Sequence, residues 1–297
     1  MDFLHFLAEL RTPFGEQFFQ FVTYFGQEVI IIAVICTLYW CVDKRFAYQI
    51  GFTYFLAGLC VQTLKITFRI PRPWILDPDF SPVESAVPAA TGYSFPSGHT
   101  QSGTCLFAPF MFRSRRWFLK LFFASAFLVI GFSRMYLGVH TPKDVLVSMA
   151  ISLCIAFVVQ KFSHFLPDSS HFQKWILLGL VLISSAISIY ALLLLGQGKI
   201  SLHYASDCCK ASAAGLGFGV GWYLETRYIH FSVQGSLPFQ IGKVLVGLLG
   251  VILLKVGMEL LFGDFLPADM AAYFLLVFWV IFLYPWILKK FHRSNSI

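Results

Sequence analysis

Long apolar stretches recur along this chain, and they constrain its fold more than any other feature. A helix needs about 20 apolar residues to cross the hydrocarbon core of a bilayer. In a bilayer every backbone polar group must find its partner within the protein, so such stretches become helices. We predict an all-α, polytopic transmembrane helical bundle of about nine spans, at residues 20–41, 46–67, 98–113, 117–138, 144–162, 174–196, 210–224, 241–262 and 270–288.

The composition supports this reading. The chain is 58% hydrophobic and only 12% of its residues are charged, whereas roughly a quarter of the residues of a soluble domain are charged. The net charge of +7 comes from basic residues scattered over short loops, without a basic tract. This pattern gives no support to nucleic-acid binding and instead indicates contact with membrane lipids, including anionic ones.

The distribution of basic residues predicts the orientation of the chain. Lys and Arg accumulate in the cytoplasmic loops of membrane proteins. When successive loops between the nine spans are assigned to alternate sides of the membrane, thirteen basic residues fall on one side and eight on the other. Lys255 falls inside a span. The thirteen-residue side is therefore expected to be cytoplasmic, with the C-terminus inside and the N-terminus outside. We expect an integral protein of the plasma (inner) membrane.

Three short motifs all fall on the predicted non-cytoplasmic face. They read K-x6-R-P, P-S-G-H and S-R-x5-H-x3-D, and they span residues 65–73, 96–99 and 133–144. Their cations are Lys65, Arg72 and Arg134. An Arg guanidinium matches phosphate oxygens bidentately and Lys adds a compact charge, although basic residues at span ends also snorkel to the interface without any ligand.

The second motif stands where a span begins. Ser97 can cap this helix, and Gly98 allows its backbone to approach a ligand. The free N–H groups of a helix start attract anions, and His99 adds a group that titrates near neutral pH. Without His99, the Ser-Gly pair would be sufficiently explained as the capped start of a helix.

The third motif pairs a histidine with a carboxylate. His140 and Asp144 are four residues apart and share one face of a helix. A carboxylate on one imidazole nitrogen fixes the tautomer and makes the other nitrogen more nucleophilic. An Asp that only caps a helix beside an unrelated His would give the same spacing.

Together the motifs contain the parts of an in-line phosphoryl transfer. Such a transfer needs a nucleophile, an acid for the leaving oxygen, and positive charge around the equatorial oxygens. His140 can attack, His99 can protonate the leaving group, and the three cations can hold the phosphoryl oxygens.

The set of motifs resembles the signature of the type 2 phosphatidic acid phosphatase family, which also includes glucose-6-phosphatases and vanadium haloperoxidases. The match runs from Lys65 to Asp144, about a quarter of the chain, with every signature position present. The resemblance implies a helical bundle and a phosphatase that uses a phosphohistidine intermediate and neither metal nor cofactor. It assigns catalysis to His140, His99 and Asp144, and phosphate binding to Lys65, Arg72, Ser97, Gly98 and Arg134.

The layout of the spans suggests three regions. Residues 1–45 form an N-terminal segment with the first span, residues 46–162 a catalytic core, and residues 163–297 an additional transmembrane block. Many lipid phosphatases of the family have two spans before the one leading into the first motif, whereas this chain has one. Nine spans and an outside N-terminus are similar to the glucose-6-phosphatase branch. Within the additional block, small residues at 211–221 are spaced for close helix packing.

The leading hypothesis is a phosphoric monoester hydrolase acting on a lipid phosphate or diphosphate at the non-cytoplasmic face. A phosphotransferase with a lipid or sugar acceptor would use the same intermediate, and a soluble sugar phosphate is a further candidate substrate. A non-enzymatic transporter is the alternative of a different class, but it has no need of an acid, a nucleophile and a phosphate clamp. The sequence leaves the head group and the oligomeric state open.

Overall fold

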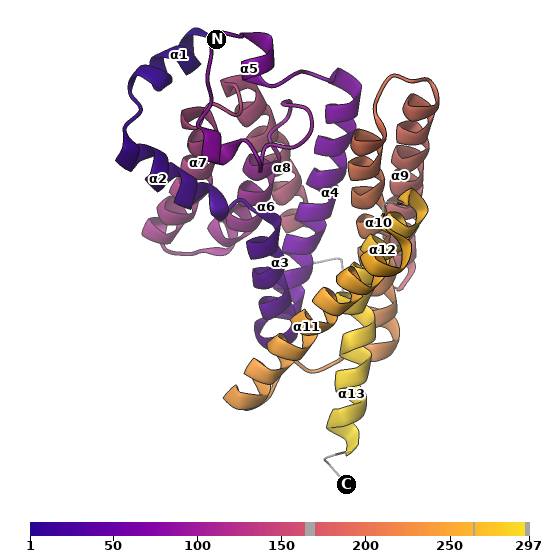
Figure 1. The fold of residues 1–297 in the computed structure, drawn as a ribbon. Coiled ribbons are helices and arrows are strands. Elements are labelled where there is room, and N and C mark those ends of the chain that lie inside the picture. The colour runs from indigo at the N-terminus through magenta and orange to yellow at the C-terminus, as the bar shows by residue number, and fades with distance from the viewer. Residues whose placement is uncertain (164–169, 264, 295–297) are drawn as a thin grey trace. The chain divides into compact units, whose positions relative to one another are not determined.

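The computed structural model describes residues 1–163, 170–263 and 265–294, and these residues form helices joined by loops, without a strand (Figure 1). The predicted all-α class is confirmed. The longer helices are α1 (Asp2–Glu9), α2 (Pro13–Tyr24), α3 (Glu28–Thr37), α4 (Lys44–Phe68), α6 (Gly98–Arg113), α7 (Trp117–Tyr136), α8 (Pro142–Phe162), α9 (Ser170–Gly196), α10 (Leu202–Leu224), α11 (Leu237–Phe262), α12 (Leu266–Phe278) and α13 (Tyr284–Ser294). Short turns of helix are α5 (Pro73–Leu76), η1 (Leu38–Val42), η2 (Glu84–Ala86), η4 (Glu225–Ile229) and η5 (Trp279–Leu283).

Six helical segments of the described residues are long and apolar enough to cross a membrane, and a seventh is possible. They are residues 44–76, 117–136, 142–162, 171–196, 237–262 and 266–290. The seventh would combine α2 with the continuous segment of α3 and η1, and the two parts are bent by 43° relative to each other. This bent pair corresponds to the predicted span at 20–41. The predicted count of nine is therefore not confirmed.

The two remaining predicted spans are helical, but their sequences are less apolar. Helix α6 is only 16 residues long, and α10 is rich in Gly, Ser and Ala. Most residues of both helices are buried inside the protein. A helix enclosed by other helices packs best with small residues and does not need the apolar surface that lipid requires.

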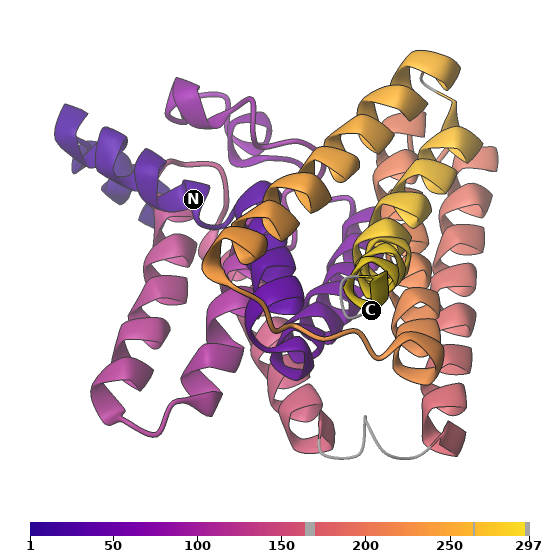
Figure 2. The ribbon, with the colours of Figure 1, turned by 90° about the horizontal axis from the view of Figure 1, so that it is seen from below.

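The chain divides into two compact units, and α4 passes from one to the other. The first unit contains residues 1–32 and 56–160. Its helices α6 and α7 are antiparallel neighbours, with α8 beside them (Figure 2). The three helices share an apolar core of buried side chains: Ala108, Phe127, Val145, Met149 and Ala156. Glycines bring the backbones close, since a Cβ at Gly103 would lie 2.9 Å from the Ile130 side chain.

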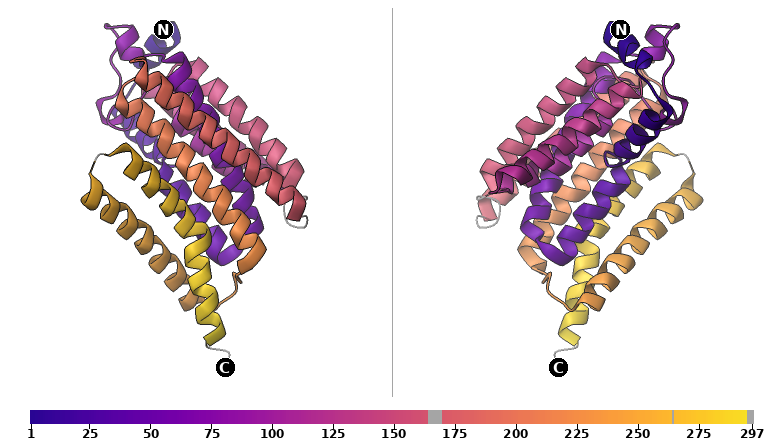
Figure 3. Two further views of the ribbon diagram at one scale, coloured as in Figure 1. Left: turned by 90° about the vertical axis from the view of Figure 1, so that its right-hand side faces the viewer. Right: turned by 90° about the vertical axis from the view of Figure 1, so that its left-hand side faces the viewer.

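The second unit contains residues 33–55 and 161–297, and α10 lies at its centre. Helix α10 packs along α9 and α12 (Figure 3). A Cβ at Gly217 would lie 2.5 Å from the backbone oxygen of Phe274, and one at Gly219 would lie 3.0 Å from Leu180. The predicted close packing around residues 211–221 is thus present, because these glycines leave no side chain between the helices.

Candidate active site

All eight predicted site residues lie in the first unit of the chain. The loop between α5 and α6 wraps around Arg72, whose side chain is only 5% exposed. Its guanidinium donates to the carbonyl oxygens of Gly92 (3.0 Å) and Thr91 (2.6 Å) in this loop, and to that of Val139 (3.0 Å) after α7. Arg72 therefore ties the proline-rich loop to the third motif.

Lys65 stands in the last turn of α4 and reaches the same loop. Its Nζ donates to the carbonyl oxygen of Tyr93 at 2.6 Å, and the residue is 9% exposed. Lys65 is also within electrostatic range of His99. The neighbouring Arg69, whose φ is +50°, is exposed.

The second motif begins α6 in the predicted way. Ser97 is fully buried and caps the helix, with Oγ accepting from the N–H and the hydroxyl of Thr100. Its own N–H donates to the backbone oxygen of Asp144 at 3.1 Å, which joins the starts of α6 and α8. A Cβ at Gly98 would meet no heavy atom within 4 Å. The helix start therefore faces open space, where a phosphoryl group could approach its N–H groups.

A tight turn after α7 places His140. Gly138 adopts φ +76°, which glycine tolerates best, and the N–H groups of Val139 and His140 then bond back to the carbonyl of Arg134. The imidazole is 2% exposed and lies 3.0 Å from Nη1 of Arg72 through Nε2. Because Arg72 can only donate, Nε2 is the acceptor and carries the lone pair.

The other nitrogen of His140 faces Asp144. The Nδ1–Oδ2 separation is 3.5 Å, which is too long for a hydrogen bond. Such contacts often shorten only when substrate is bound. The same Oδ2 accepts from Ser94 Oγ at 2.6 Å and from the Thr141 N–H at 2.9 Å, so the carboxylate is held in place from two sides.

Arg134 is fully buried in α7 and only partly paired. Its Nη1 donates to Thr23 Oγ1 at 2.7 Å, while Nε and Nη2 have no hydrogen-bond partner. Nε2 of His99 is also buried without a partner. His99 is within electrostatic range of Lys65, Arg72 and Arg134. Three cations thus act electrostatically on one imidazole, and two buried donors of Arg134 are left for an anionic ligand.

Burial holds the pKa of His140 well below its usual range. The charges of Arg72 and Arg134 act in the same direction, whereas Asp144 partly opposes them. His140 is therefore a neutral imidazole at neutral pH, which is the form that can attack. Among the residues that the structure describes, no group of three or more His, Cys, Asp or Glu side chains is arranged to hold a metal ion.

Sequence reasoning missed two hydroxyl residues of this site. Ser94 lies in the loop before the second motif, and Thr23 lies in α2, about 40 residues before the first motif. Neither stands at a motif position, and each became visible only through its contact with Asp144 or Arg134.

Two family models match parts of this chain. The PAP2 superfamily model matches residues 46–168, which include all eight predicted residues. The model of the PAP2 superfamily phosphatase transmembrane extension matches residues 209–296.

Two curated relatives come from Bacillus subtilis. An undecaprenyl-diphosphatase is 34% identical over 114 residues, which are 37% of this chain and 55% of that protein. A phosphatidylglycerophosphatase is 26% identical over 165 residues, which are 52% of this chain and 77% of that protein. The chain thus spans only about half the length of the first relative.

Among solved structures, Aquifex aeolicus LpxE is similar with a TM-score of 0.46 and 22% identity, over 54% of this chain and 93% of that one. Two family models that carry the same superfamily name cover most of the sequence, one over the site and the other over the C-terminal helices, so this integral membrane protein belongs to the PAP2 superfamily.

Proposed function

We propose that this protein is a metal-independent phosphatase that hydrolyses a lipid phosphate or diphosphate through a phosphohistidine at His140. The observation that carries the proposal is the arrangement around this imidazole. Nε2 lies 3.0 Å from Arg72, Nδ1 faces Asp144, and the buried donors of Arg134 have no partner. A phosphoryl group bound between the two arginines would lie within reach of Nε2.

The first chemical step would transfer the phosphoryl group to the enzyme. Nε2 of His140 attacks phosphorus while the bond from phosphorus to the leaving oxygen breaks, and His99 donates a proton to that oxygen. Asp144 stabilises the positive charge that develops on the His140 ring. Lys65, Arg72 and Arg134, with the backbone around Ser97 and Gly98, hold the three equatorial oxygens.

The second step would release phosphate. Neutral His99 takes a proton from water, the resulting oxygen attacks phosphorus, and the bond from phosphorus to Nε2 breaks. Both histidines then return to their starting states. An acceptor alcohol in place of this water would make the enzyme a phosphotransferase.

The same proposal covers the organisation and placement of the chain. Residues 46–162 would act as the catalytic core, after an N-terminal segment of residues 1–45 and before an additional block of residues 163–297. The basic-residue distribution supports a site at the non-cytoplasmic face of the plasma (inner) membrane, with the C-terminus inside. Reporter fusions at the C-terminus test this orientation. Activity of a reporter that works only outside the cytoplasm would show that the C-terminus lies outside, opposite to the prediction.

Phosphate release by purified protein in excess EDTA tests the activity. The names of the two relatives put undecaprenyl diphosphate and phosphatidylglycerol phosphate first, followed by phosphatidic acid, a sphingoid phosphate and glucose 6-phosphate. We expect release from at least one lipid, loss of release in His140→Ala, and full release in His203→Ala, whose side chain is 59% exposed on α10.

Adding an alcohol acceptor separates hydrolase from transferase. The hydrolase proposal is wrong if the phosphoryl group appears only on the acceptor and no inorganic phosphate is released. The metal-independent mechanism is wrong if EDTA abolishes release and Mg²⁺ restores it. Acid-labile, base-stable labelling of wild type, absent from His140→Ala, would identify the phosphohistidine.

A further inference from the structure

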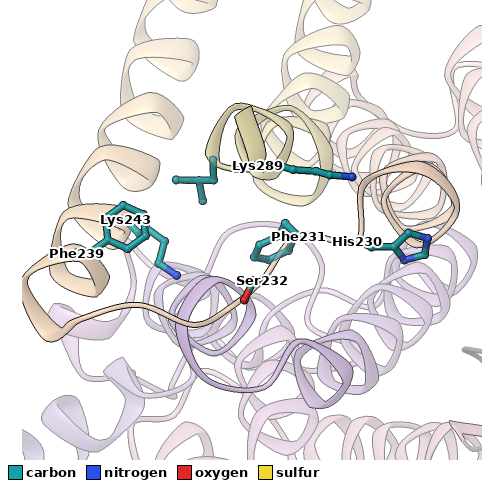
Figure 4. Close-up of a pocket in the computed structure, with 7 residues that line it drawn as sticks. His230, Phe231, Ser232, Phe239, Lys243 and Lys289 are labelled. Carbon is teal, nitrogen blue, oxygen red and sulfur yellow. The ribbon is translucent and has the colours of Figure 1, made fainter. Parts of the chain in front are cut away.

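A pocket of about 240 Å³ opens in the second unit, and no part of the proposed reaction uses it. Figure 4 shows its lining, in which Lys243 and Phe239 come from α11 and Lys289 comes from α13. The segment after η4 completes it with His230, Phe231 and Ser232. Two lysines and a histidine thus line a small cavity that is otherwise largely aromatic and aliphatic.

Lys243 is 3% exposed, although an ammonium group is costly to bury. Its Nζ donates to the carbonyl oxygens of Trp40 (2.8 Å) and Val233 (3.0 Å), and it lies 5.3 Å from the ring centre of Phe239. An ammonium group has three protons to donate. Two go to neutral carbonyls and the ring of Phe239 is uncharged, so these contacts do not neutralise the formal charge of Lys243.

Lys289 repeats this arrangement on another wall of the pocket. Its Nζ donates to the backbone oxygens of Ile229 and, at 3.4 Å, Tyr228. Of the ion pairs formed by the described residues, none involves Lys243 or Lys289. Both lysines are therefore held by carbonyl dipoles alone, and their charges are not neutralised by a carboxylate of the described chain.

The peptide segment between the two lysines is fixed in place. Buried Glu225 accepts from the Phe231 N–H at 3.1 Å, and Lys44 donates to the Phe231 oxygen at 3.2 Å. Glu225 and Lys44 also pair with each other at 2.9 Å, so this carboxylate is already matched. This wall of the pocket is thus held in one position, which lowers the entropic cost of binding a ligand there.

We propose that this pocket binds the phosphate of an anionic phospholipid headgroup, with Lys243 and Lys289 as its cations. A lipid fits better than free phosphate because apolar surface continues from the pocket along α11. Phe239, which lines the pocket, is exposed together with Val246 and Leu253. These residues are spaced seven apart on one helix, so they form one stripe that begins at the pocket and along which an acyl chain can lie. The site lies outside the proposed catalytic core.

Thermal unfolding of the full-length protein in neutral detergent tests the proposal. Phosphatidylglycerol is a suitable probe because its phosphodiester is not a substrate for a monoester hydrolase. We expect it to raise the unfolding midpoint, since a ligand that binds only the folded state stabilises that state. Phosphatidylcholine and inorganic phosphate at the same concentration should have little effect.

Matched variants locate the effect. Lys289→Gln should weaken the apparent affinity for phosphatidylglycerol about tenfold, the loss of one charge-assisted hydrogen bond. Lys290→Gln makes the same change in net charge at the next residue, whose Nζ lies over the Trp286 ring at 3.8 Å, and should bind like wild type. His230→Asn adds a test of the middle of the pocket, because Asn tolerates the φ of +51° found there.

Three results would overturn the proposal. The first is an equal response of wild type and Lys289→Gln to phosphatidylglycerol. The second is an equal effect of phosphatidylcholine, which would show that any lipid suffices. The third is an equal effect of inorganic phosphate, which would assign the pocket to a free anion. Activity is not the readout, so failure here leaves the proposed phosphatase reaction standing.

Discussion

Thr23 accepts a hydrogen bond from Nη1 of Arg134 at 2.7 Å, and both residues are fully buried. Arg134 belongs to the third motif, whereas Thr23 lies in α2, before the first residue matched by the superfamily model. The N-terminal segment therefore contributes directly to the proposed phosphate site. Nearby, a Cβ at Gly26 would lie 2.8 Å from the backbone oxygen of His99, so this segment also packs against the second motif.

Thr23→Val should lower kcat/KM about tenfold, because valine keeps the shape of the side chain but removes the oxygen that accepts from Nη1 of Arg134. The loss is equivalent to one hydrogen bond to a charged group. Thr23→Ser keeps the acceptor and should restore most of the activity. Steady-state kinetics on the best lipid substrate, with inhibition by vanadate, measure the effect. Equal activity of the Val and Ser variants would show that the hydroxyl does not position Arg134.

The pH profile should have its acidic limb below about 6.5, the ordinary pKa of histidine. Burial, Arg72 and Arg134 lower the pKa of His140, so protonation inactivates the nucleophile only at lower pH. Asp144 raises this pKa. Asp144→Asn should therefore move the acidic limb further down while also reducing the maximal rate. A limb that moves up in Asp144→Asn would contradict the assignment of that limb to His140.

Ser94→Ala should reduce kcat by about tenfold, because Asp144 loses a charge-assisted hydrogen bond of 2.6 Å and is free to turn away from His140. Ser85→Ala removes an exposed hydroxyl from the same loop, which makes only a 3.4 Å contact with Gln20, and should leave the rate unchanged. Rates and circular dichroism of the two variants separate a catalytic effect from misfolding. A similar loss of rate in both variants would show that the effect comes from the loop as a whole and not from the contact with Asp144.

Gly217→Ala should destabilise the second unit by about 1–3 kcal/mol, the usual cost of overpacking. The new methyl group would lie 2.5 Å from the backbone oxygen of Phe274, which cannot move like a side chain. Gly242→Ala, where a Cβ meets nothing within 4 Å, should be neutral or stabilising, since alanine favours a helix. Thermal unfolding in detergent compares them, and equal midpoints would show that α10 and α12 adjust freely.

The sequence predicted helices better than it predicted membrane spans. Six predicted spans correspond to apolar helices, because a long apolar run leaves few other structures open to the chain. Helix α6 matches its predicted limits at residues 98 and 113, yet it is too short and too polar to count as a span by itself. Its Ser, Thr and Gly residues are buried against neighbouring helices, and such burial is a tertiary property.

By itself the sequence determined the helical class and the membrane character, and it supplied the candidate set of phosphate-handling residues, because hydrophobic run length and motif chemistry are local properties. Only the tertiary structure decided how these residues face one another. It placed Arg72 on His140, brought Ser94 to Asp144, and enclosed Arg134 with Thr23 from a distant helix. These contacts join residues 50 to 111 positions apart, and such pairs are fixed by helix packing, which no local pattern encodes.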